Sequence, residues 1–109
     1  MNIDANKILS DCNREWTFWI HSGTIVRNIY EMVKAIETMS DEVFTYHVND
    51  DNQKNDFALW IEAVLGDDML ASKLKYVRDR KRYAAIIRER IKYLEKNSDR
   101  KVLEVENIN

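Results

Sequence analysis

The chain has 109 residues, 45% of them hydrophobic and 33% charged, which is enough apolar material for one globular domain with a single core. It contains no Pro and only two Gly, a composition that favours helices with short connections and excludes a Gly-rich phosphate-binding loop. There is no apolar run of the roughly 18 residues that a membrane span needs. Because the single cysteine cannot form an internal disulfide and no signal peptide is recognisable, we expect a cytoplasmic protein with no membrane association.

The net charge is only −2, but it is unevenly distributed along the chain. Residues 73–96 carry ten Lys and Arg against three Asp and Glu, a net charge of +7, so the rest of the chain carries −9. Such an asymmetry can steer a charged partner, or it can hold a small domain together through internal ion pairs. Both interpretations remain open at this point.

The first predicted element is a short β-hairpin. WTFWI (16–20) is rich in β-branched and aromatic residues, HSG follows it as turn material, and TIVR (24–27) is again β-prone. This order predicts two antiparallel strands that turn at Gly23. An isolated hairpin is barely stable, so we expect it to pack against helices.

Two helices are predicted next. Asn28 precedes residues 29–39, where apolar positions recur at helical spacing, and Glu31 stands where it can complete a capping box. Ser40 begins a second, shorter helix whose apolar side includes His47.

The polar loop 49–55 leads into a helix that starts at Asn55 and Asp56, carries a wide apolar stripe and ends at Gly66. Asp67 or Asp68 caps the following helix. The last helix spans roughly residues 79–96, and Arg90 falls within its apolar stripe. A charge at that position must reach water or find a carboxylate.

Together these elements predict a mainly α fold, a compact bundle of about five helices with a short N-terminal β-hairpin. We divide the chain into an N-terminal segment (1–15), a single helical domain (16–96) and a C-terminal tail (97–109). Within the tail, VLEVENI (102–108) is either a strand that joins the hairpin or a frayed end.

Metal binding and catalysis both lack a convincing motif. One Cys and two His without paired spacing cannot build a closed zinc site, and the acidic loop has Asp56 where a calcium loop needs Gly. A His47–Asp56 pair is physically possible, but no residue is marked out as the nucleophile that it would serve. The simpler interpretation is that His47 packs at a helix end and bonds the loop backbone. We therefore expect no enzyme, no metal and no cofactor.

Nucleic-acid binding through residues 73–96 is the alternative function, because tyrosines alternate there with basic side chains that could neutralise phosphates. Against it, the sequence pI of about 5.7 is far from the basic value typical of such modules. The simpler interpretation is a solvated helix face whose positive charge balances the negative charge of the rest of the domain. The candidate residues are Lys75, Arg78, Arg80, Lys81, Arg82 and Arg88.

The aromatic residues are numerous for so short a chain, and most should be buried in the core. If residues 16–20 form a strand, Trp16 and Trp19 point to opposite faces. One of the two would then stay exposed and could anchor a partner or a second copy of the chain.

FTYHVN (44–49) followed by NDFALWIEAVLGDDMLASKL (55–74) resembles a small, mostly helical prokaryotic domain family of unknown function that is frequent in archaea. In that family an aromatic residue and HVN lead to an Asn-Asp-Phe helix start, a Trp two or three residues on and a Gly-Asp break. The resemblance covers roughly residues 16–90 and implies no activity. The positions that it picks out are His47, Asn49, Asn55, Asp56 and Trp60.

The sequence therefore favours a non-enzymatic protein-interaction or regulatory module. Its binding surface would join the loop 47–56 to an exposed tryptophan, and homo-oligomerisation is an open alternative. A small enzyme using the histidine of that loop would instead need a deep pocket around it. The candidate partner-binding residues are Trp16, Trp19, His47, Asn49, Asn55 and Asp56.

Overall fold

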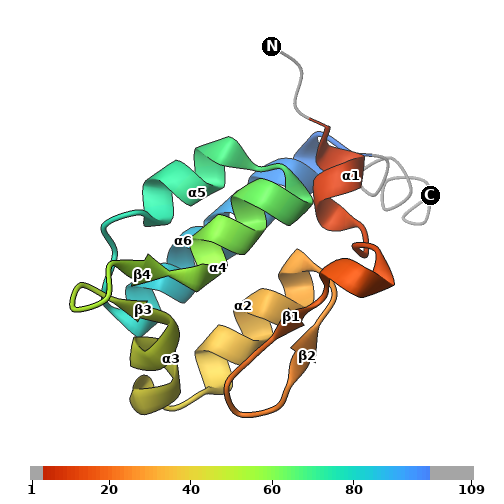
Figure 1. The fold of residues 1–109 in the computed structure, drawn as a ribbon. Helices are drawn as coiled ribbons and strands as arrows, with labels where there is room; N and C mark the ends of the chain where they lie inside the picture. The colour runs from red at the N-terminus through yellow and green to blue at the C-terminus, as the bar shows by residue number, and fades with distance from the viewer. Residues whose placement is uncertain (1–3, 99–109) are drawn as a thin grey trace.

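The longest helix, α6, lies alongside α2, and the other elements are arranged around this pair (Figure 1). The computed structural model describes residues 4–98. In chain order its elements are α1 (Ala5–Leu9), the 3-10 turn η1 (Arg14–Trp16), β1 (Phe18–Trp19), β2 (Ile25–Val26), α2 (Ile29–Thr38), α3 (Asp41–His47), β3 (Val48–Asn49), β4 (Lys54–Asn55), α4 (Asp56–Trp60), the π-helical turn η2 (Ile61–Leu65), α5 (Asp68–Leu74) and α6 (Arg80–Lys96). The predicted mainly α fold with an N-terminal hairpin is confirmed, with six α-helices in the described range instead of about five.

The helices begin where the sequence places capping residues. Asn28 accepts a hydrogen bond from the backbone N–H of Glu31 at 2.8 Å, and Asp67 accepts one from the N–H of Leu70 at 3.1 Å. The capping box at α2 is displaced by one residue, because Glu31 reaches back to the N–H of Arg27 and not to that of Asn28. These caps satisfy backbone donors that would otherwise lack a partner at the helix ends.

The helix predicted from Asn55 to Gly66 is divided into α4 and the wider turn η2. The backbone N–H of Asp67 donates to the carbonyl of Ile61 at 3.2 Å, and Gly66 ends the turn with a φ of 80°. The sequence predicted a residue in the left-handed backbone conformation at this position, and Gly adopts that conformation at little steric cost. The π-helical turn was not predicted from the hydrophobic pattern.

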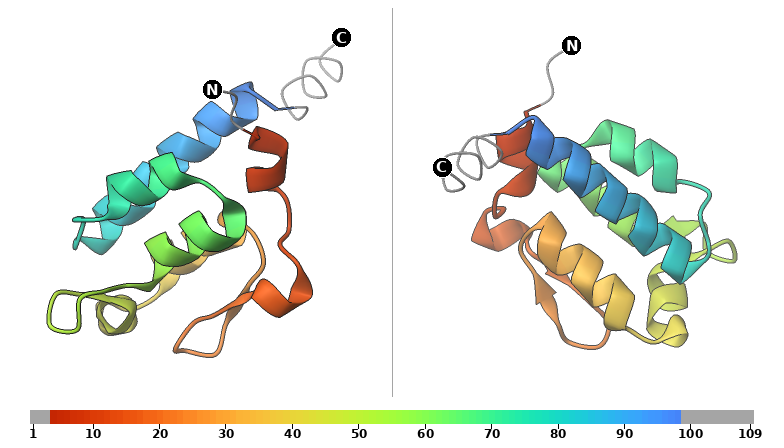
Figure 2. Two further views of the ribbon diagram at one scale, coloured as in Figure 1. Left: turned by 45° about the horizontal axis from the view of Figure 1, so that its top comes forward. Right: turned by 180° about the vertical axis from the view of Figure 1, so that it is seen from behind.

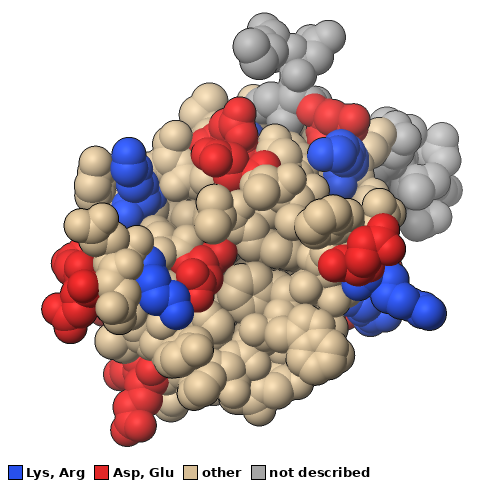
Figure 3. Space-filling view, viewed as in Figure 1, with Lys and Arg blue, Asp and Glu red and all other residues tan. Residues whose placement is uncertain are grey.

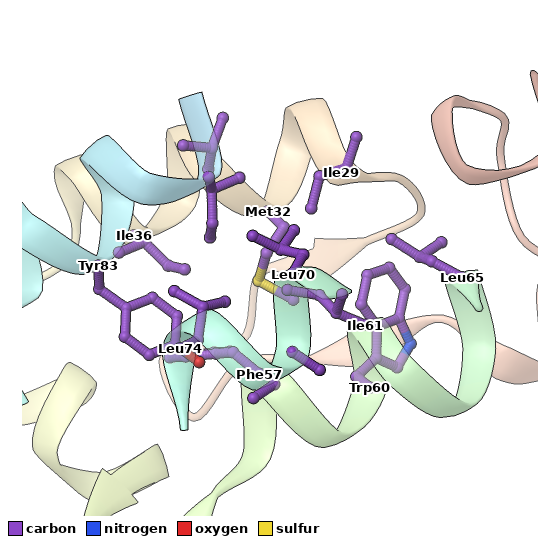
Figure 4. Packing of buried hydrophobic residues seen from close by; sticks show 14 of the residues in the cluster. Ile29, Met32, Ile36, Phe57, Trp60, Ile61, Leu65, Leu70, Leu74 and Tyr83 are labelled. Carbon is purple, nitrogen blue, oxygen red and sulfur yellow. The ribbon is translucent and has the colours of Figure 1, made fainter. Parts of the chain in front are cut away.

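The core lies where α2, α4, η2, α5 and α6 meet (Figure 4). In the close view, side chains from these elements converge on one another, and most of the labelled ones are fully buried. Each such side chain contributes about 1.5–3 kcal/mol through burial, so these contacts hold the bundle together. The labelled residues without exposed surface are Ile29, Met32, Ile36, Phe57, Ile61, Leu70, Leu74 and Tyr83.

One charged side chain also lies in the core. Arg90 is buried in the apolar side of α6, as its position predicts, and it donates two hydrogen bonds to the carboxylate of Asp67 at 2.8 and 2.9 Å. Of the two expected alternatives, reaching water or finding a carboxylate, the structure shows the second. Because Asp67 also caps α5, this pair joins the start of α5 to the middle of α6.

Helix α1 belongs to this core, although the sequence analysis assigned no element to the N-terminal segment. Ala5, Ile8 and Leu9 are buried, and α1 packs against α2, η2 and α6. A five-residue helix is too short to be stable in isolation, so it depends on this packing. That is why its sequence gives little helical signal.

The N-terminal hairpin is present but shorter than predicted. Strands β1 and β2 are antiparallel, with Phe18 opposite Val26 and Trp19 opposite Ile25. Gly23 occupies the turn with a φ of 101°, as expected. Directly opposed residues share a face of the sheet, so the first pair faces the core side and the second faces outward.

A second strand pair lies inside the polar loop that follows α3. Strands β3 and β4 are antiparallel, with Val48 opposite Asn55 and Asn49 opposite Lys54. The sequence predicted a loop here, because two-residue strands of polar residues carry no alternating pattern. The strand considered at residues 102–108 lies outside the described residues.

Figure 2 places α6 and α2 next to each other at the back of the molecule, opposite to the face seen in Figure 1. Helix α4 and the hairpin β1–β2 therefore lie on the other face. That face carries the candidate functional site.

Candidate functional site

A shallow groove crosses the face formed by β1, the end of α3, β4 and α4. We call it the Trp19 groove; its volume is about 520 Å³. Aromatic and apolar side chains make up most of its lining, and charged groups lie at one margin. Its lining includes Trp19, Tyr46, His47, Asp56, Leu59 and Trp60.

His47 lies beneath this groove, where it ties three elements together. The residue is only 4% exposed. Nδ1 lies 2.9 Å from a carboxylate oxygen of Asp56, and Nε2 accepts a hydrogen bond from the backbone N–H of His21 at 3.0 Å. Because a backbone N–H can only donate, Nε2 carries no proton, and Nδ1–H donates to Asp56. The ring is therefore a neutral imidazole with a fixed tautomer.

Burial lowers the pKa of His47, and the hydrogen bond to Asp56 opposes this effect in part. Lys54 lies 3.4 Å from the same carboxylate oxygen of Asp56 and further lowers the pKa of His47. Both ring nitrogens are engaged, so in this arrangement neither can accept a proton from a substrate.

Of the two predictions made for His47, one is confirmed and the other is wrong. The prediction that it packs at a helix end is confirmed, since it is the last residue of α3 and contacts the ring of Phe57 at a centroid distance of 4.9 Å. Its backbone partner, however, belongs to the turn of the first hairpin and not to the loop after α3. Sequence spacing could not reveal a partner 26 positions away.

At the margin of the groove, the side chains of His21 and Lys54 both pack against the ring of Tyr46. His21 lies flat on Tyr46 with ring centroids 3.8 Å apart, and the ammonium of Lys54 lies 4.2 Å from the centroid of the Tyr46 ring. His21 is exposed, as expected for a turn residue.

The two asparagines of the predicted site make internal contacts. Asn49 donates to the carbonyl of Thr45 at 2.8 Å and accepts from the N–H of Asn52 at 2.9 Å. Asn55 accepts from the hydroxyl of Tyr83 at 2.6 Å, caps α4, and donates at 3.0 Å to the carbonyl of Leu74, the last residue of α5. Their amide groups hold the β3–β4 turn and the start of α4 in place.

Both tryptophans of the predicted site are exposed, Trp16 by 58% and Trp19 by 68%. The expectation that only one of them would be exposed is wrong, because Trp16 belongs to the turn η1 and not to a strand. Alternation between two faces therefore does not apply to this pair. The carbonyl of Trp16 accepts a hydrogen bond from the indole N–H of Trp60 at 2.7 Å, which fixes η1 against α4.

Two exposed residues of the groove, Tyr46 and Leu59, were missed by the sequence analysis. Leu59 is 64% exposed and lies off the apolar stripe of its helix. An apolar residue on the polar side of an amphipathic helix was the signal that could have identified it. Tyr46 gave a similar signal, two positions after the buried Phe44.

Half of the basic side chains proposed to contact phosphates form internal ion pairs. Lys75 lies 5.5 Å from the ring centroid of Tyr76, whereas Lys81 and Arg82 are exposed. The pairs are Arg78–Asp50 at 2.8 Å, Arg80–Asp41 at 2.8 Å and Arg88–Glu37 at 2.7 Å. Positive charge in 73–96 therefore meets acidic residues of α2, α3 and the β3–β4 turn.

Within residues 4–98, no helix has both the length and the apolar character that crossing a bilayer demands. In the same range, no three His, Cys, Asp or Glu residues are grouped so that they could hold a metal ion.

No curated protein and no solved structure matches this chain. One family model does match, over residues 17–107, so the match includes α6, which the sequence resemblance placed at or beyond its edge. This confirms the resemblance to a family of unknown function. The chain belongs to DUF5752, a family of unknown function.

Proposed function

We propose that this protein is a non-enzymatic interaction or regulatory module, and that the Trp19 groove is the surface that binds a protein partner. The observation that carries the proposal is the exposure of Trp19, Tyr46 and Leu59 around one shallow groove; Trp16 is also exposed but does not line this groove. Exposed apolar side chains scattered singly need no explanation, but a group of them on one face is typical of a binding surface. Tryptophan and tyrosine are also the residues that most often dominate binding energy.

The polar residues of the site divide into two roles in this proposal. His47, Asn49 and Asn55 position the backbone, because their side chains bond within the chain. Asp56 is the polar group that a partner can reach, since it is only partly buried and lies beside Lys54 at the groove margin. A partner with a hydrogen-bond donor at this point would add specificity to apolar contacts.

An enzymatic role has less support than binding. A catalytic His47 would need a free ring nitrogen beside a deep pocket, whereas both nitrogens are bonded and the groove above the ring is shallow. A cytoplasmic setting is part of the proposal because the single cysteine, Cys12, is typical of a reducing compartment.

The test is affinity capture from an extract of the source organism, with and without nuclease. Immobilised wild-type chain should retain specific proteins that Trp19→Ser and Asp56→Asn lose. Tyr76→Ser is the matched control, because Tyr76 is an aromatic residue that is 80% exposed and lies outside the groove. It should retain what the wild type retains.

Thermal melting of each variant completes this test. We expect Trp19→Ser and Asp56→Asn to melt within a few degrees of wild type, since both side chains are at least partly exposed. If both variants unfold, or if both capture the same proteins as the control, the groove is not the binding surface.

A further inference from the structure

The exposed apolar residues of the Trp19 groove extend beyond the groove itself. Ile25 lies directly opposite Trp19 in the hairpin, so both side chains project from the outer face of β1–β2. Leu59 of α4 and Tyr46 of α3 border the same groove from the other side. All four are at least 45% exposed.

A second cavity continues this surface toward α1. Its volume is about 680 Å³, and its lining includes Trp16, Cys12 and the π-helical residues Ala63 and Val64. The Trp19 groove is lined by the same Ala63 and Val64. The two hollows therefore meet at η2, and we call their combined surface the η2 face.

The exposed apolar area of the η2 face is large for a chain of this size. The exposed fractions of Trp16, Trp19, Ile25, Tyr46 and Leu59 run from 45% to 68%. With about 150–250 Å² for each aromatic side chain and somewhat less for the aliphatic ones, they expose roughly 500–600 Å². That is at the upper limit of the largest apolar patch on a typical monomer, about 300–600 Å².

Few charged residues line the η2 face, and both signs occur in each of its two hollows. Lys54 and Asp56 lie at the Trp19 end, and Lys7 and Asp11 lie at the α1 end. Figure 3 shows the uncharged area over β1, β2 and α4 between groups of blue and red side chains. A strongly acidic or strongly basic partner would not meet a surface of opposite charge here. A surface that carries both signs of charge can instead be complementary to a second copy of itself.

We infer that the partner that occupies the η2 face is a second copy of this chain, bound by a two-fold contact of the two identical faces. The inference rests on the proposed function, which it makes specific. Two such faces would bury about 1,000–1,200 Å² of apolar surface, and the polar rim would bring the interface toward the ~1,600 Å² of a standard specific contact. In a two-fold arrangement, Lys54 of each copy can lie near an acidic side chain of the other.

Sedimentation equilibrium of the purified full chain over a wide concentration range tests this inference. The mass should rise from the 13.0 kDa of one chain toward twice that value as the concentration increases. Leu59→Glu places a carboxylate on both sides of the two-fold contact, and Trp19→Ser removes an exposed anchor. Each should raise the dissociation constant of the dimer at least tenfold.

Met69→Glu is the matched control for Leu59→Glu, because Met69 is an exposed apolar helix residue outside the η2 face. It should associate like the wild type. If Trp19→Ser alters folding, Leu59→Glu decides, since an exposed helix position tolerates Glu. The inference is overturned if the wild type stays at the mass of one chain, or if Leu59→Glu associates as tightly as Met69→Glu.

This experiment separates the inference from the proposed function. A wild-type chain that stays monomeric but still captures another protein through Trp19 overturns the inference and leaves the proposed function in place. A dimer that Leu59→Glu dissociates supports the inference whether or not an extract contains further partners.

Discussion

At the scale of single residues, His47 joins the hairpin, α3 and α4 through one neutral imidazole. Its Nε2 accepts from the N–H of His21, and its Nδ1–H donates to Asp56. A proton added to Nε2 would remove the acceptor on which the N–H of His21 depends. The protonation of this ring is therefore coupled to the attachment of the hairpin.

This coupling predicts a loss of stability in mild acid. The pKa of His47 in the folded chain lies below its ordinary value of 6.5, so the unfolded chain binds a proton more readily. Stability should be at its full value above pH 6.5 and should decrease as the pH falls below 6.5 through the folded pKa. Urea unfolding between about pH 7 and about pH 5 measures this slope, above the range where most carboxylates titrate.

His47→Gln should be less stable and should lose most of that slope. His21→Asn should keep it, because the backbone N–H of His21, and not its imidazole, makes the hydrogen bond. An unchanged slope in His47→Gln would assign the pH dependence to other groups.

The buried pair of Arg90 and Asp67 gives a second prediction at this scale. Arg90→Met leaves the carboxylate of Asp67 buried without its partner and should cost about 3–5 kcal/mol in the free energy of unfolding. The double variant with Asp67→Asn should recover part of that loss, because no unpaired charge stays in the core and Asn can still cap α5. Urea denaturation of the two single variants and the double variant measures this; strictly additive losses would contradict it.

At the scale of elements, α6 is held to α2 by side chains from its polar side as well as its apolar side. The guanidinium of Arg80 donates to Asp41 and to the carbonyls of Ile36 and Glu37, near the end of α2. Those carbonyls have no partner within their own helix, and a cation beside them is also favoured by the helix dipole. Arg80 therefore caps a neighbouring helix.

Arg80→Ala should reduce the free energy of unfolding by about 1–3 kcal/mol, because it leaves these carbonyls and the carboxylate of Asp41 without their donor. Arg82→Ala is the matched control, with the same charge on the same helix but an exposed side chain. It should change stability by no more than about 0.5 kcal/mol. Equal effects of the two variants in urea unfolding would show that only net charge matters.

At the scale of the whole molecule, internal ion pairs balance part of the charge asymmetry of the sequence. The basic segment 73–96 lies against the acidic residues that precede it, as the pairs of Arg78, Arg80 and Arg88 show. Ion pairs of this kind reduce the positive field that the segment presents to solvent. These ion pairs are our reason for keeping the simpler interpretation of the basic segment, a helix face whose charge is balanced within the domain, as the prediction to be tested.

We therefore expect the protein not to retard a double-stranded oligonucleotide in a gel assay at low salt. Binding by counterion release would require several basic side chains free to contact phosphates, and it would weaken steeply as salt is added. A retarded complex that is lost in Lys81→Glu and Arg82→Glu would instead support the nucleic-acid alternative. Both residues are exposed, so these substitutions leave the internal pairs intact.

The sequence by itself determined most of the helices and the turn residues between them. Asn28 and Gly66 stand where predicted, and Asp67 is one of the two predicted caps, because capping and left-handed backbone are local requirements, met by a few residue types at fixed offsets. The position of Arg90 within the apolar stripe followed from helical periodicity, and the structure decided that it pairs with a carboxylate instead of reaching water.

Tertiary structure decided what the local pattern could not encode. The burial of α1, the donor to His47 from the distant His21, and the attachment of η1 through Trp60 all depend on contacts between residues far apart in the chain. The candidate site is of this kind as well. Its individual aromatics were visible in the sequence, but their meeting on one face required the fold, because surface proximity is set by how helices and hairpins pack and not by spacing along the chain.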